Sequence, residues 1–141
     1  MLFLRSTLLA LLISLATADR IAFSFCNYCS ASPSGGAPTC NSAVYQHNGD
    51  GDGDCNNFQT GDIAQGGCTP SDSVDTPMGE ARYEVVDGCE TRGPGELKGG
   101  LVEKANSVGF AYSCFVQEGE FSNTCGIITF ACQRMMECVS V

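Results

Sequence analysis

Side chains that commonly carry catalysis are scarce in this sequence. It contains one histidine, His47, and no tryptophan. A mechanism that needs two histidines is therefore excluded by count, and a Ser-His or Cys-His pair would have to use His47. No Gly-x-Ser-x-Gly motif is present to place a serine nucleophile. We therefore predict a non-enzymatic protein without catalytic residues, in which His47 lies exposed in a loop beside Asn48 and Gly49.

Positive charge is also scarce. The chain has 7 Lys+Arg residues against 16 Asp+Glu residues, which gives a formal net charge of −9 at pH 7. Eleven of the acids fall between residues 50 and 96, where only Arg82 and Arg92 oppose them. A negative field of this kind repels phosphate backbones and anionic lipid headgroups. We therefore expect no binding to nucleic acid or membranes. A basic protein, a glycan or a cation remains a candidate partner.

Long apolar runs are absent except at the beginning of the chain. Leu8–Leu15 is interrupted only by Ser14, follows Arg5 and precedes the small-residue sequence Ala16-Thr17-Ala18. This order is typical of a secretory signal peptide and is too short to span a bilayer comfortably. We predict that residues 1–18 are a cleaved signal peptide and that residues 19–141 form one cysteine-rich domain. The domain is expected to be secreted and extracellular, and to act as a monomer.

Cysteine is abundant, and its even count allows five disulfides. Cys26 and Cys29 form a C-x-x-C motif, but no second such motif or nearby histidine completes a zinc site. In an oxidising compartment we expect structural disulfides that use every cysteine. The spacing does not fix the pairing. The ten residues are Cys26, Cys29, Cys40, Cys55, Cys68, Cys89, Cys114, Cys125, Cys132 and Cys138.

Apolar residues gather in short alternating runs between segments rich in glycine and proline, a pattern typical of β-strands joined by loops. The expected strands are Ile21–Phe25, Ala43–Tyr45, Arg82–Val86, Val108–Val116 and Gly126–Cys132. The expected loops are His47–Gly67, Thr69–Gly79 and Gly88–Gly100, with a hairpin turn at Gln117–Glu120. One helical turn is expected at Leu101–Asn106, and a short helix or a pinned tail at Gln133–Cys138. We predict a small, disulfide-rich, β-dominated (α+β) single domain with short antiparallel strands, long loops and up to five disulfides.

The stretch HNGDGDGDCNNF, which begins at His47, resembles half of a calcium-binding loop. Counted from Asn48, the oxygen ligands Asn48, Asp50 and Asp52 are followed by a glycine in the sixth place. The twelfth place holds Gln59, which has no carboxylate to offer the ion. Two interpretations stay open: a calcium site formed by Asn48, Asp50, Asp52 and Asp54, or a solvated acidic turn. We favour the second and expect no obligatory cofactor.

The combination of a cleavable signal, many cysteines, many glycines and no catalytic motif resembles the small secreted cysteine-rich proteins of filamentous fungi, many of which are candidate effectors. The resemblance implies a virulence-related effector or toxin-like protein that binds an extracellular molecule of a host or competitor. A second hypothesis is a cell-wall polysaccharide binder or a carboxylate-based glycoside hydrolase, although no motif selects two acids. A third is a protease inhibitor in which Arg92, next to a cysteine in a Gly/Pro loop, enters an acidic specificity pocket.

Overall fold

The chain folds into a sheet of long antiparallel strands. The structure is a computed structural model and describes residues 19–49, 55–77, 79–105 and 108–141, so the predicted signal peptide lies outside the described residues. Within them, a single turn of 3₁₀-helix, η1, accompanies the strands. The elements are β1 (Arg20–Ser30), β2 (Thr39–Asn48), β3 (Phe58–Thr60), β4 (Ser71–Thr76), β5 (Gly79–Val85), η1 (Cys89–Thr91), β6 (Leu97–Glu103), β7 (Tyr112–Val116), β8 (Glu120–Cys125) and β9 (Ile128–Ser140).

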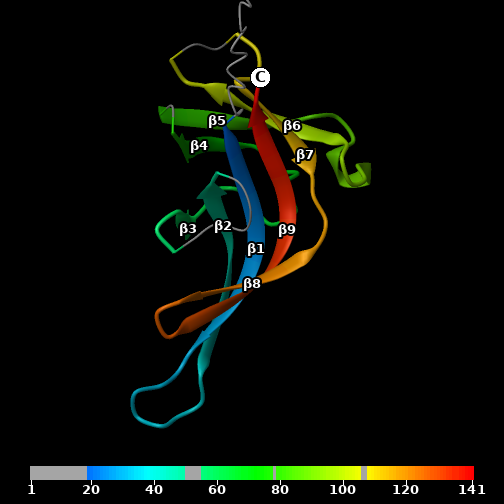
Figure 1. The fold of residues 1–141 in the computed structure, drawn as a ribbon. Helices are drawn as coiled ribbons and strands as arrows, with labels where there is room; N and C mark the ends of the chain where they lie inside the picture. The colour runs from blue at the N-terminus through cyan, green and yellow to red at the C-terminus, as the bar shows by residue number, and fades with distance from the viewer. Residues whose placement is uncertain (1–18, 50–54, 78, 106–107) are drawn as a thin grey trace, which may run out of the picture.

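The strands form one sheet in the order β3-β2-β1-β9-β7-β6-β5-β4. The long strands β1 and β9 lie at its centre and run side by side along the molecule (Figure 1). β7 pairs with the C-terminal half of β9 and β8 with its N-terminal half, so both follow the same side of β9. The prediction of a β-dominated, disulfide-rich single domain is confirmed.

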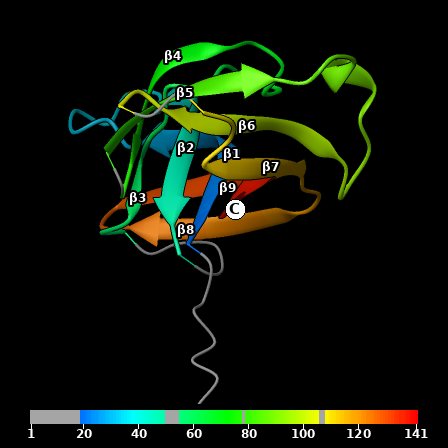
Figure 2. The same cartoon turned by 90° about the horizontal axis from the view of Figure 1, so that it is seen from above.

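The sheet curls around its main core (Figure 2). Strands β2 and β4 lie near opposite ends of the strand order, yet the Gln46 Nε2 atom donates a hydrogen bond to the Asp75 carbonyl oxygen at 2.5 Å. The side chains enclosed by this curl come from strands across the sheet and include Ile21, Phe23, Val44, Val74, Tyr83, Leu101, Tyr112 and Met136. Their burial supplies the main hydrophobic stabilisation of the domain.

A second cluster lies on the opposite face of β2. Tyr45 belongs to this cluster whereas its neighbour Val44 belongs to the main core, because successive side chains of a strand point to opposite faces. The Tyr45 ring stacks on Phe58 at 4.6 Å between centroids, and Phe130 packs edge-on against both. The Cys26–Cys132 disulfide is part of the same cluster. The central strands therefore bury side chains on both faces.

Both expected helical segments are strands. Leu101–Glu103 completes β6, and Gln133–Cys138 lies within β9. The β9 segment lacks a regular alternation because its register against β1 shifts between Phe23 and Ser24. A bulge of this kind lets the consecutive residues Met135 and Met136 both be buried, which breaks the expected alternation.

Several expected loops and one turn are also corrected. Gln117–Glu120 is not a hairpin turn, because β7 and β8 both pair with β9 and not with each other. The expected loops are shorter than predicted, since they contain β3, β4 and the beginning of β6. The strand expected at Val108–Val116 begins only at Tyr112. No helix among the described residues is long and apolar enough to cross a membrane.

Candidate functional site around the Cys68–Cys89 disulfide

All ten cysteines form disulfides, as predicted. The pairs are Cys26–Cys132, Cys29–Cys40, Cys55–Cys125, Cys68–Cys89 and Cys114–Cys138. Cys26 and Cys29 of the C-x-x-C motif bond to different strands and not to each other. Three of the bonds join residues that face each other directly on paired strands, whereas Cys68–Cys89 joins two segments outside the strands.

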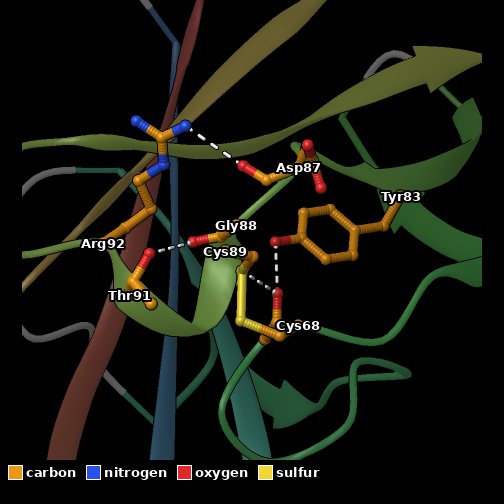
Figure 3. The surroundings of a disulfide bond; sticks show 8 residues. Cys68, Tyr83, Asp87, Gly88, Cys89, Thr91 and Arg92 are labelled. Carbon is orange, nitrogen blue, oxygen red and sulfur yellow. Dashed lines mark hydrogen bonds between the residues drawn. A yellow bond between two sulfur atoms is a disulfide. The ribbon is translucent and has the colours of Figure 1, made fainter.

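The segment Asp87–Glu96, here called the Cys89 loop, is ordered by covalent and hydrogen bonds (Figure 3). Its first half contains η1, in which the Thr91 hydroxyl donates to the Gly88 carbonyl oxygen at 2.8 Å. The Cys68–Cys89 bond ties this turn to the segment between β3 and β4. The second half is anchored to β7, because the Gly95 amide donates to the Val116 carbonyl oxygen at 2.8 Å. The loop is therefore held at both of its ends.

Arg92 is the exposed cation of this loop. Its backbone is extended, with φ −74° and ψ 132°, immediately after η1. Its guanidinium donates to the Asp87 carbonyl oxygen at 3.1 Å, which directs the side chain back over the loop (Figure 3). The Cys89–Arg92 backbone bond adds a further constraint at 3.2 Å. Arg92 is thus presented at the surface by a backbone with little freedom to move.

A buried tyrosine supports the segment on the other side of the disulfide. The Tyr83 hydroxyl donates to the Gly67 carbonyl oxygen at 2.6 Å, and the ring is fully buried (Figure 3). Gly67 has φ +65°, a left-handed conformation that favours glycine. A Cβ atom there would also lie 3.1 Å from Lys98 Cε. Glycine is therefore the residue that lets this segment pass close over Lys98.

Alkaline pH should destabilise the protein through Tyr83. Burial raises the pKa of Tyr83 to about 12, from an ordinary value of 10.0. Between these values the unfolded chain releases the phenolic proton while the folded protein keeps it, so the free energy of unfolding falls as pH rises from 10 to 12. Rapid denaturant titrations at several pH values should show this slope. Tyr83→Phe should make the slope shallower without removing it, because burial also raises the pKa of Tyr45 and of Tyr112. The same substitution should cost about 1–3 kcal/mol at neutral pH because the Gly67 carbonyl loses its donor.

Lys98 is a site residue that sequence reasoning missed. It is 9% exposed and lines a cavity of about 370 Å³ together with Arg92, Glu90, Gln65, Thr69 and the Cys68–Cys89 bond. In the sequence it is an ordinary lysine in a glycine-rich stretch, and only the fold reveals its burial. A neighbouring hollow of about 490 Å³ shares the disulfide but is lined by Asp87 and Glu90 without a cation.

The other predicted site residues do not join this cavity. His47, expected in an exposed loop, is buried in β2, with its ring centroid 6.3 Å from that of Phe121 and 6.4 Å from that of Phe58. Asn48 is the last residue of β2, and the remaining calcium-ligand candidates, Asp50, Asp52 and Asp54, lie outside the described residues. Within the described part of the chain, no three His, Cys, Asp or Glu side chains converge as metal ligands.

Together these features define a disulfide-stapled antiparallel β domain with one pre-ordered loop beside a cationic cavity. No family model, no curated protein and no solved structure matches the chain. The chemistry of the loop and the cavity therefore has to be inferred from their own residues.

Proposed function

We propose that the protein is a secreted, non-enzymatic effector or toxin-like protein that binds an extracellular molecule of a host or competitor through the Cys89 loop. The observation that carries the proposal is the order of this loop, which a disulfide, a 3₁₀ turn and bonds to β7 hold while Arg92 stays exposed. A loop that is ordered before binding loses less conformational entropy when it binds. Disulfides also suit a protein exposed to extracellular proteases.

The binding proposal predicts that Arg92 is needed to retain a partner. The oxidised domain, residues 19–141, is immobilised and exposed separately to soluble extracellular protein and to insoluble wall material of a host. Arg92→Ala should weaken retention of the partner about tenfold, equivalent to about 1.4 kcal/mol, because arginine is enriched among residues that dominate interfaces. Lys104→Ala is the matched control, since Lys104 is an exposed cation that pairs with Glu80 outside the loop. Equal retention by both variants would reject the Cys89 loop as the binding surface.

One observation favours a protease inhibitor as a second candidate function. Arg92 combines an extended backbone with an exposed basic side chain three residues after a disulfide-bonded cysteine. Such a side chain could fill the acidic specificity pocket of a trypsin-like enzyme. An inhibition titration with trypsin would test this idea. Undiminished inhibition by Arg92→Ala would reject the proposed contact.

A polysaccharide binder receives less support from the fold. Sugar rings stack on exposed aromatic faces, and the chain has no tryptophan. Tyr45, Tyr83 and Tyr112 are buried, which leaves Tyr28, itself half-buried, as the one tyrosine with substantial exposure. Wall material is kept in the retention experiment so that this alternative is measured directly.

A further inference from the structure

A β-bulge places Lys98 inside the molecule. In the pairing of β6 with β7, Leu97 faces Phe115 and Gly99 faces Cys114, so that Lys98 is an extra residue without a partner position on β7. Bulges of this kind redirect the side chain of the extra residue. The Lys98 stem passes beside Gly67, in the segment that Tyr83 anchors. Lys98 is also one of the residues that line the cavity beside the Cys68–Cys89 disulfide.

The Lys98 side chain has no ion partner among the described residues. No hydrogen bond or ion pair joins its Nζ atom to any residue in the described ranges. Burial without such a partner disfavours the charged form, and desolvation accordingly lowers the pKa of Lys98. The Nζ atom keeps some contact with solvent, but partial desolvation of a cation that has no ion partner is still unfavourable for folding. A lysine at this position is therefore best explained by an anion that it meets from outside the chain.

The charges around the cavity indicate which anion fits. Lys98 and Arg92 contribute two positive charges and Glu90 one negative charge, so the lining carries a net charge of about +1 at neutral pH. A single carboxylate balances this charge. A phosphate dianion would exceed it. Gln65 and Thr69 add polar side chains at the same cavity.

We propose that this cavity binds an aspartate or glutamate side chain of a protein partner, with Lys98 as the largely enclosed cation and Arg92 as the exposed one. The inference rests on the proposed binding function and adds the chemistry of the partner. The volume of about 370 Å³ lies within the range of small-ligand pockets, roughly 300–1,000 Å³, and accommodates one such side chain. The cavity lining has no aromatic ring. A protein carboxylate therefore fits better than the uronic acid of a polysaccharide, which would gain from ring stacking.

The test measures binding of a defined carboxylate to the oxidised domain by NMR. The probe is N-acetyl-glutamate N-methylamide, titrated at constant ionic strength, with the corresponding glutamine compound as the uncharged control. We expect the glutamate probe to shift the amide signals of Gly66, Gly67 and Cys89, and the glutamine compound to leave them in place. Lys98→Met should weaken probe binding at least tenfold while the fold is kept, because methionine retains the apolar stem and removes the buried charge. Lys104→Met, a control at an exposed lysine just after the end of β6, should bind the probe normally.

Three outcomes would overturn this inference. One is unchanged affinity of Lys98→Met for the glutamate probe, and another is equal binding of the glutamine compound. Tighter binding of galacturonate than of the glutamate probe would reject a protein as the source of the carboxylate. The retention experiment separates failure of this inference from failure of the proposed function. If Arg92→Ala loses the partner and Lys98→Met keeps it, the loop binds as proposed and only the carboxylate assignment fails.

Discussion

Replacing Cys26 and Cys132 together by alanine should lower the free energy of unfolding by about 5 kcal/mol, the largest loss expected from any single disulfide. The bond closes a loop with a sequence separation of 106 residues, although the Cys55–Cys125 bond inside this loop keeps part of the unfolded chain cross-linked when Cys26–Cys132 is removed. The loop entropy therefore lies between about 3 kcal/mol, for a loop of about 15 residues, and about 4.7 kcal/mol, for one of about 100 residues. Both cysteines are also buried within the aromatic cluster, where the lost sulfur atoms leave space. Urea denaturation of the oxidised proteins measures the change.

The matched control is the double alanine variant of Cys29 and Cys40. This bond also joins directly opposed residues of paired strands, but it closes a loop with a separation of only 11 residues and is exposed. The same relation gives about 3 kcal/mol or less for a loop of this size. We therefore expect the two variants to differ by about 2 kcal/mol. Equal losses would show that neither the longer loop nor the burial of Cys26–Cys132 adds to its contribution.

The second large effect is expected from Gly99→Ala. A Cβ atom on Gly99 would overlap the Glu84 carbonyl oxygen of the paired strand β5 and lie 2.9 Å from the Tyr83 ring. A backbone carbonyl in a ladder cannot move without separating β5 from β6. The substitution should therefore cost at least about 4 kcal/mol, beyond the range of ordinary point substitutions. Urea denaturation, together with the yield of correctly oxidised protein, measures this effect.

Gly100→Ala provides a comparison for the cost of Gly99→Ala, because the added Cβ atom would meet a side chain and not the backbone. A Cβ atom on Gly100 would overlap the ring of Phe110, which is half-buried and has room to move. Gly100→Ala should therefore cost less, about 1–3 kcal/mol. In a double-mutant cycle, Phe110→Ala should offset part of the Gly100→Ala loss and none of the Gly99→Ala loss. If Phe110→Ala also offset the loss caused by Gly99→Ala, the Gly99 effect would not come from the backbone contact with Glu84.

The strands that sequence reasoning identified are those with a regular alternation of large apolar residues. Ile21–Phe25 lies in β1 for this reason, and the expected strand Gly126–Cys132 overlaps β9 from Ile128 onward, with Gly126 and Ile127 in the turn before it. The sequence pattern does not predict β4 because this strand is polar, with Val74 as its one fully buried residue. The pattern also fails to predict the second half of β9, because a bulge interrupts the alternation of buried and exposed side chains there. Cross-strand pairing, which no local pattern reveals, lengthens the strands beyond their apolar centres.

The candidate site was predictable only in part. Composition and spacing pointed to an exposed Arg92 near a disulfide, and the structure places it there. The partner of Cys89 could not be deduced, since ten cysteines allow many pairings. The burial of Lys98 depends on a bulge in β6 and on the close passage of Gly67, which comes from a distant part of the chain. Neither feature leaves a periodic signal in the sequence.

The adjacency of the two ends of the described domain determines how it would respond to tension. The Ser140 amide donates to the Asp19 carbonyl oxygen at 2.9 Å, and β1 and β9 run antiparallel from this point. A pull on residues 19 and 141 would open the β1–β9 ladder one residue pair at a time, beginning with Arg20 and Val139. The opening would stop at Cys26–Cys132, where the force passes through a covalent bond. The chain between these two cysteines, with the Cys89 loop, would carry no load, so a tethered molecule could be stretched without losing its binding surface.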